Sequence, residues 1–175
     1  MKKAGIVLAV LAAMAASFFL MTKLFLYYAN RPLGGAAVFK TEKVKETKEV
    51  LQFIHKSHES FNSFLNYGKA EKYTEGDWKQ LRKWFGEQEQ GLKTIDQKAV
   101  NAKIKKDLKR SYEITKLGID TGNIQYVILG HRVYHDLDIL TNGYSEETNI
   151  WGCTEFGNGQ HVKELEEEIK KNKKG

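Results

Sequence analysis

Residues 74–95, TEGDWKQLRKWFGEQEQGLKTI, carry the clearest structural signal in the chain. Within them, apolar side chains and one glutamine recur at alternating intervals of three and four residues, the spacing of one face of an α-helix. The positions on this face are Trp78, Leu81, Phe85, Gln88, Leu92 and Ile95. Thr74 and Asp77 fit a capping box, so we expect the helix to start after Thr74.

Helical patterns continue on both sides of this segment. We expect an earlier helix from about Val38 to Tyr67, because it contains a stripe with helical spacing. The stripe consists of Val50, Leu51, Ile54, His58, Phe61 and Leu65. A later stretch from about Gln97 to Thr141 is also helical in pattern, and Gly118 and Gly122 predict a break or kink near its middle. The bundle therefore has four helices with a break and three without one.

Beyond Asn142 the pattern changes. Residues 144–160 are rich in glycine and aromatic residues and predict an irregular loop or a short hairpin. A charged helix or tail follows over residues 161–175, where Glu166 and Lys170 are spaced to pair across one turn. The expected fold class is all-α, with an N-terminal transmembrane helix, a three- or four-helix up-down bundle, an irregular glycine-aromatic loop and a charged C-terminal helix.

The N-terminal residues predict a membrane anchor. The run from Ala4 to Thr22 holds no charged side chain and would measure about 28 Å as a helix, close to the ~30 Å hydrocarbon core of a bilayer. Apolar residues resume after Lys23 and continue to Tyr28, which makes the run longer than the core of an ordinary signal peptide. We therefore expect an uncleaved single-pass anchor over residues 4–28.

Composition divides the chain into an anchor (1–29), a linker (30–37), a helical domain with its closing loop (38–160) and the charged C-terminal segment (161–175). The net charge of +6 arises mainly in the first 40 residues, which hold five bases and no acid. The rest is nearly neutral, which does not favour binding to nucleic acid. Positive charges on the two sides of the run are nearly balanced, so the positive-inside rule does not decide its orientation. The short basic N-terminal tail is typical of a bacterial signal-anchor and favours a domain on the extracytoplasmic side of the cell membrane.

Small residues form one row along the expected anchor helix, at intervals of four. The row consists of Gly5, Ala9, Ala13 and Ser17. Such a row permits close pairing of membrane helices and favours a homo-oligomer held through the anchor. The alternative is an alanine-rich span without a pairing role.

One helical face between residues 124 and 138 changes from apolar to polar. At 100° per residue, His131, His135 and Asp138 fall on one narrow stripe, opposite an apolar face of the same helix. Imidazoles one turn apart and a carboxylate supply donors that zinc or iron accepts. His58 interrupts the apolar stripe of the first domain helix and could add a ligand from a facing helix. These four residues form the candidate metal site.

The same side chains fit other roles. A hydrogen-bonded network of these histidines and Asp138 would fix the register of the helices without any ligand. Acid–base catalysis and pH sensing also stay open, because histidine titrates near neutral pH. The sequence has no P-loop, GxGxxG, CxxC or nucleophile-elbow motif. We therefore expect a non-catalytic protein without a cofactor, with zinc or iron only under the metal-site alternative.

Aromatic residues of the glycine-rich loop supply the candidate interaction surface. Trp151 and Phe156 flank Cys153, the single cysteine of the chain, which cannot form an internal disulfide. Such aromatics either tuck the loop against the bundle or, when exposed, form a partner-binding patch. Trp84 lies off the apolar stripe of its helix and raises the same question.

These features favour a small membrane-anchored protein whose helical domain binds another protein at the cell envelope. Trp151, Phe156 and Trp84 are the expected contact residues. The alternative is a metal-binding, hydrolytic or non-hydrolytic bundle that uses the stripe of His131, His135 and Asp138. A sensory domain for a small ligand or pH is a third class.

Overall fold

A computed structural model describes residues 14, 16–21, 44–65, 69–142 and 150–172 of the chain. Internal contacts divide the chain into two units, residues 1–32 and 33–175. In the first unit, residues 16–21 are helical, and the apolar side chains from Phe18 to Met21 are 62–76% exposed. Most of the predicted anchor and the whole linker at 30–37 lie outside the described residues, as do Gly5, Ala9 and Ala13 of the small-residue row.

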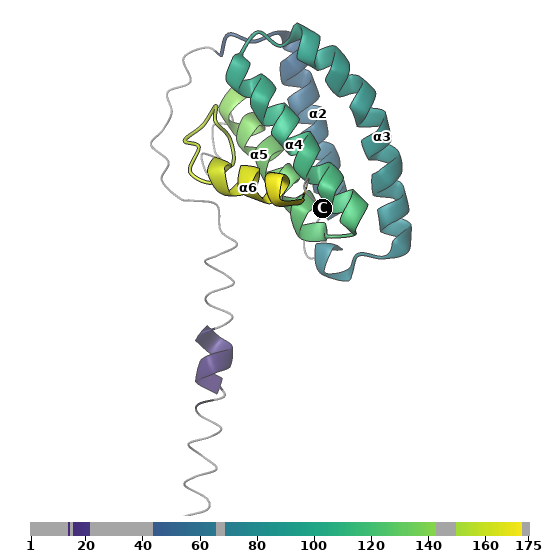
Figure 1. Ribbon diagram of the computed structural model, residues 1–175, viewed down its shortest axis with the longest axis vertical. Helices are drawn as coiled ribbons and strands as arrows, with labels where there is room; N and C mark the ends of the chain where they lie inside the picture. The colour runs from purple at the N-terminus through teal and green to yellow at the C-terminus, as the bar shows by residue number, and fades with distance from the viewer. Residues whose placement is uncertain (1–13, 15, 22–43, 66–68, 143–149, 173–175) are drawn as a thin grey trace, which may run out of the picture. The chain divides into compact units, whose positions relative to one another are not determined.

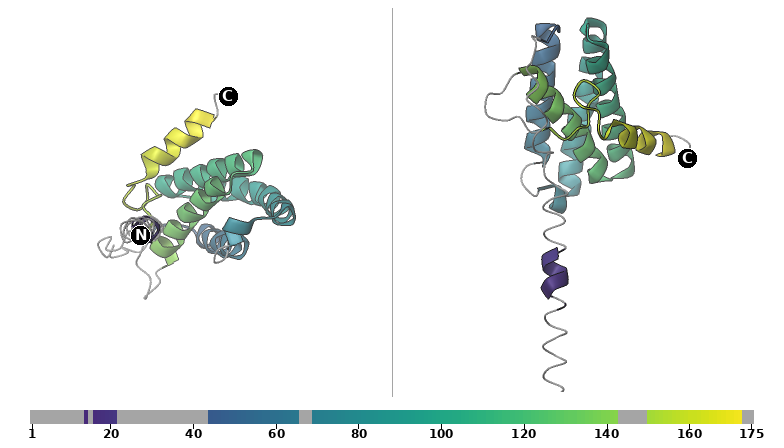
Figure 2. Two further views of the ribbon diagram at one scale, coloured as in Figure 1. Left: turned by 90° about the horizontal axis from the view of Figure 1, so that it is seen from below. Right: turned by 90° about the vertical axis from the view of Figure 1, so that its left-hand side faces the viewer.

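The second unit is all-helical in its described residues and confirms the expected helical bundle. Its elements are α2 (Lys48–Leu65), the 3₁₀ turn η1 (Lys69–Lys72), α3 (Glu75–Lys98), α4 (Ala102–Thr121), α5 (Ile124–Asn142) and α6 (Val162–Asn172). Helices α2 to α5 run alternately up and down, and α6 lies across them (Figure 1). Figure 2 shows α6 projecting to one side of the bundle. Among all the helices that are described, none has both the length and the apolar character to cross a membrane.

Local sequence signals set several helix ends. Thr74 caps α3 as predicted, because its hydroxyl oxygen accepts from the amide of Asp77 at 3.3 Å and the Asp77 carboxylate accepts from the amide of Thr74 at 3.0 Å. Gly122 ends α4 in the left-handed conformation, with φ of 66°. Only glycine adopts this conformation at low cost. The break predicted between residues 118 and 122 is therefore real, and the bundle has four helices.

Two predicted helix starts were wrong. The first domain helix begins at Lys48 rather than near Val38, since the described residues 44–47 are not helical. The carboxylate of Glu46 accepts the amide protons of Val100 and Asn101 at 3.1 and 3.0 Å, which ties this segment to the turn between α3 and α4. The later helix begins at Ala102 rather than near Gln97, because α3 continues to Lys98 and Asn101 caps α4.

Helices α4 and α5 approach each other closely at two glycines. A Cβ atom on Gly118 would lie 2.9 Å from the backbone nitrogen of Val127, and one on Gly130 would overlap the hydroxyl of Thr115. Ser111 on α4 donates a hydrogen bond to the carbonyl oxygen of Gly130 at 2.9 Å. This contact makes α5 a central helix, which packs against α4 on one side and α2 on another.

We expect Gly130→Ala to lower the free energy of unfolding by about 1–3 kcal/mol, because the added methyl group overpacks the α4–α5 contact. Gly86→Ala is the matched control, since Gly86 is exposed within α3 and its Cβ would meet nothing within 4 Å. The control should stabilise the protein by about 0.5–1 kcal/mol. Urea unfolding of the full chain in mild detergent measures both values. Equal changes in the free energy of unfolding for the two substitutions would contradict the close approach of α4 and α5.

Candidate functional site

The structure brings together the histidines and the aspartate that the sequence singles out. His131, His135 and Asp138 lie on α5 and face His58 on α2. The ring centroid of His58 lies 5.3 Å from that of His131 and 5.2 Å from that of His135. The ring centroids of His131 and His135 are 6.4 Å apart. Residues separated by more than seventy positions in the chain thus form one cluster, which we call the histidine cluster.

Asp138 orients the ring of His58. Its carboxylate is fully buried, and Oδ2 lies 2.8 Å from His58 Nδ1 and 3.3 Å from His55 Nδ1. The other oxygen accepts from the side-chain amide of Asn142 at 2.6 Å. The contact between His58 and Asp138 fits the tautomer of His58 that carries its proton on Nδ1, because a carboxylate oxygen accepts from an N–H group. The Nε2 atom of a neutral His58 therefore presents a lone pair.

Asn62 links two of the imidazoles. Its Nδ2 atom lies 3.4 Å from His58 Nε2, and its Oδ1 atom lies 2.9 Å from His131 Nε2. Asn62 is one turn beyond His58 on α2 and has an exposed side chain. We did not predict this residue, although its i+4 spacing from His58 places both on one helix face.

Burial governs the charge of His131. Desolvation, followed by the nearby His58, His135 and Arg132, lowers the pKa of His131 to about 3. His131 is therefore neutral at pH 7. Among the described residues, and with the side chains in these positions, no group of three or more histidine, cysteine, aspartate and glutamate side chains is already placed to hold a metal ion.

Two further aspartates hold the loop that follows α5, a role that we did not predict for either residue. Asp136 and Asp107 are both fully buried. The Asp136 carboxylate accepts from the amides of Trp151 and Cys153 at 2.6 and 2.7 Å, and Asp107 accepts from the amides of Glu155 and Phe156 at 2.8 and 2.9 Å. Backbone amides carry no side-chain signature, so the sequence does not reveal such pairs.

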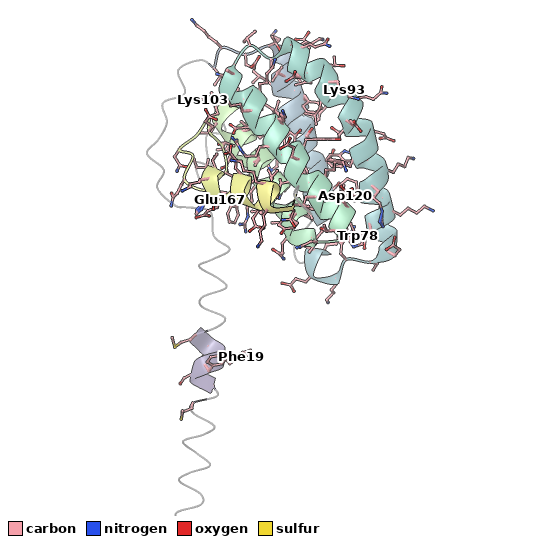
Figure 3. All side chains as sticks on the ribbon, viewed as in Figure 1. Phe19, Trp78, Lys93, Lys103, Asp120 and Glu167 are labelled. Carbon is pink, nitrogen blue, oxygen red and sulfur yellow. The ribbon has the colours of Figure 1, made fainter. Side chains whose placement is uncertain are left out.

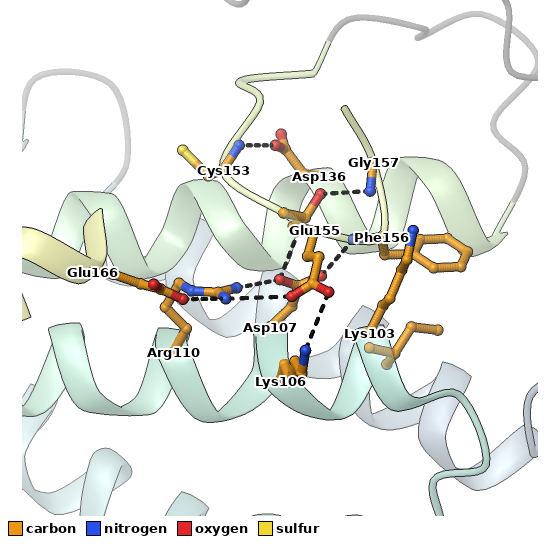
Figure 4. A network of polar contacts seen from close by, with 12 residues as sticks. Lys103, Lys106, Asp107, Arg110, Asp136, Cys153, Glu155, Phe156, Gly157 and Glu166 are labelled. Carbon is orange, nitrogen blue, oxygen red and sulfur yellow. Dashed lines mark hydrogen bonds and ion pairs between the residues drawn. The ribbon is translucent and has the colours of Figure 1, made fainter. Parts of the chain in front are cut away.

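Arg110 extends this network to α6. Its guanidinium donates to the Asp107 carboxylate and, at 2.8 Å, to the carboxylate of Glu166 (Figure 4). Burial raises the pKa of Asp107, and its two amide donors and Arg110 oppose that effect. Burial also raises the pKa of the Cys153 thiol to about 12. A thiol with this pKa stays protonated at neutral pH, which argues against Cys153 as a nucleophile.

The expected interaction aromatics are half-buried. The guanidinium of Arg132 lies 4.0 Å from the ring centroid of Trp151. Phe156 packs against the hydrophobic core. Trp84 lies with its ring centroid 4.9 Å from that of Phe61 and is also part of the core surface.

A groove of about 530 Å³ lies between α3 and α4. Its apolar lining comes from Leu92, Leu108 and Tyr112, and its rim carries charges. The rim residues are Glu89, Lys93, Asp96, Lys105 and Lys109. Figure 3 shows the side chain of Lys93 projecting from α3. We call this feature the α3–α4 groove.

Comparison of the chain with protein families, with characterised proteins and with solved structures finds no match. The histidine cluster and the α3–α4 groove are the features of the domain that bear on its function.

We expect the protein to lose stability as the pH falls below about 6.5. The unfolded chain binds a proton at His131 near pH 6.5, whereas the folded protein excludes it until about pH 3. Between these values this side chain lowers the free energy of unfolding by up to ~1.4 kcal/mol for each unit of decreasing pH.

His131→Gln should flatten the pH dependence of unfolding between pH 4.5 and 6.5. Urea unfolding of the full chain in detergent with EDTA measures it. His161→Gln is the control, because His161 lies outside the cluster and pairs with Glu164 at 2.9 Å. If the free energy of unfolding of His131→Gln depends on pH as it does in the parent, folding does not lower the pKa of His131.

Proposed function

We propose that this chain is a single-pass membrane protein whose helical domain binds another protein at the cell envelope and catalyses no reaction. The α3–α4 groove is the observation that carries the binding part of the proposal. The N-terminal apolar run supports the membrane part. Lys2 and Lys3 before that run support an extracytoplasmic position of the domain.

The apolar side chains of residues 18–21 support the anchor. These residues are helical, and their side chains are 62–76% exposed. Such exposure to water is unfavourable, because each Å² of exposed apolar surface costs about 25 cal/mol. A lipid bilayer removes this cost. The uncharged sequence on both sides of these residues extends the same apolar character over a length that fits a bilayer.

The groove suits an amphipathic helix of the partner. A groove between two neighbouring helices, with apolar side chains at its base, can accept a third helix. That helix inserts its apolar side chains at helical spacing. Leu92 and Tyr112 are only half-buried, so a docked helix would remove their remaining surface from water.

Charges on the rim define the orientation of such a helix. Acids Glu89 and Asp96 lie on the α3 side, together with Lys93, and bases Lys105 and Lys109 lie on the α4 side. At one point Lys105 Nζ is 3.7 Å from Asp96 Oδ1. We expect the partner helix to present basic residues toward α3 and acidic residues toward α4, since charge complementarity fixes register.

We favour the groove over the loop aromatics as the main contact. Trp151, Phe156 and Trp84 already pack against the bundle, and the backbone around the first two is bound by Asp136 and Asp107. Their exposed edges remain available as secondary contacts.

The anchor predicts that the protein stays in the membrane after alkaline extraction and that the mature protein retains residues 4–28. A cysteine introduced by Lys103→Cys, in a Cys153→Ser background, should react with a membrane-impermeant maleimide in intact cells. The same cysteine after permeabilisation is the reference. Recovery in the soluble fraction, or an N-terminus beyond residue 15, would contradict the anchor, and protection from the reagent would contradict the orientation.

The groove predicts one dominant photo-crosslinked partner. A photo-crosslinking amino acid at Lys93 or Lys109, on the groove rim, should give in intact cells a single adduct with another envelope protein. The control positions are Lys83 and Glu87, which lie on α3 away from the groove. The identified protein should then bind the purified full chain, and Leu92→Glu should weaken that binding at least tenfold because it places a charge on the groove floor.

Each outcome of this experiment is informative. Adducts that form equally at the control positions, or binding that Leu92→Glu leaves unchanged, would overturn the assignment to the groove. An adduct with a second copy of the chain would replace the partner by a homo-oligomer. Circular dichroism and the unfolding midpoint check that Leu92→Glu is folded.

A further inference from the structure

Two nitrogen atoms of the histidine cluster contact the same side-chain amide. His58 Nε2 and His131 Nε2 each contact one end of the Asn62 carboxamide, at 3.4 and 2.9 Å. Two imidazoles from different helices thus direct their Nε2 atoms at the same small group. Asn62 is exposed, so its side chain can swing into solvent at little cost.

The third imidazole lies beside the other two, with its ring centroid 5.2 Å from that of His58. His135 Nδ1 lies 3.5 Å from Asp136 Oδ1. His131 and His135 are one helical turn apart, which is the spacing at which two histidines of a helix reach one metal ion.

Distances within the cluster agree with this arrangement. Three imidazoles bound to one tetrahedral zinc at about 2.0–2.1 Å would have ring centroids roughly 5 Å apart. The observed separations of 5.3 and 5.2 Å from His58 already match. The separation of 6.4 Å between His131 and His135 requires these rings to close by about 1 Å, through rotation of their side chains.

We propose that His58, His131 and His135 bind one divalent transition-metal ion through their Nε2 atoms. Asp138 is not a ligand in this site. It orients His58 through Nδ1, as carboxylates commonly do for metal-bound histidines. The site goes beyond the proposed partner binding and does not depend on it.

The donor set selects zinc among the metals that the sequence suggested. Three neutral imidazoles with a fourth position for water make a known type of zinc site. Non-haem iron prefers two histidines and a carboxylate in direct contact. The oxygens of Asp138 accept from His58, His55 and Asn142, so this carboxylate is committed to orienting side chains.

Cobalt binding to the full chain in detergent tests the site, because Co²⁺ replaces zinc and reports coordination by its visible absorption. The chain is freed of any affinity tag and stripped with EDTA. We expect one Co²⁺ per chain with the intense absorption of four-coordinate cobalt, and displacement of that signal by one equivalent of Zn²⁺. His58→Gln, His131→Gln and His135→Gln should each weaken binding by more than 100-fold.

Three variants separate the roles of the surrounding residues. Asp138→Asn should weaken cobalt binding by about 10- to 100-fold, which is typical of an orienting residue. Asn62→Ala should bind cobalt at least as tightly as the parent, because the amide only fills the position of the ion. His161→Gln is the control for histidine content and should change nothing.

Several results would overturn the proposal. They are no cobalt bound at millimolar concentration, six-coordinate absorption, binding that survives His58→Gln, and equal loss of binding in His161→Gln. Where a glutamine variant does not fold, proton NMR of the cobalt-loaded parent replaces it. Three shifted imidazole N–H signals support the site, and fewer than three contradict it.

Discussion

Three aspartates with no solvent exposure, Asp107, Asp136 and Asp138, constrain the rest of the helical domain. A buried carboxylate costs several kcal/mol unless hydrogen-bond donors surround it. Asp107 and Asp136 obtain those donors from the backbone of residues 151–156, and Asp138 obtains them from α2 and from Asn142. The position of the closing loop and the register of α2 against α5 are therefore set by the need to satisfy these charges.

The same constraint explains why a structural network and a ligand site are compatible here. Asp138 fixes His58, and Asp136 lies beside His135 while it also holds the loop at Trp151 and Cys153. Side chains held in this way lose little freedom when a ligand binds, which favours binding.

The parts of the fold that depend on neighbouring residues could be predicted from the sequence. The capping box at Thr74, the break at Gly122 and the stripe of His131, His135 and Asp138 are all local patterns. What could not be predicted depends on residues far apart in the chain. Glu46 leaves the helical pattern because of amides more than fifty residues away, and Asp107 pairs with amides of the closing loop.

Helix α3 shows what periodicity measures and what it does not. Its apolar stripe is the strongest pattern in the sequence, yet only Leu81 and Ile95 of that helix are buried. Periodicity reports which face of a helix is apolar, whereas burial depends on whether a neighbouring helix covers the whole face. Leu92 stays half-buried where it lines the groove between α3 and α4. The part of the stripe that the domain does not cover is therefore the part with the most to gain from a partner.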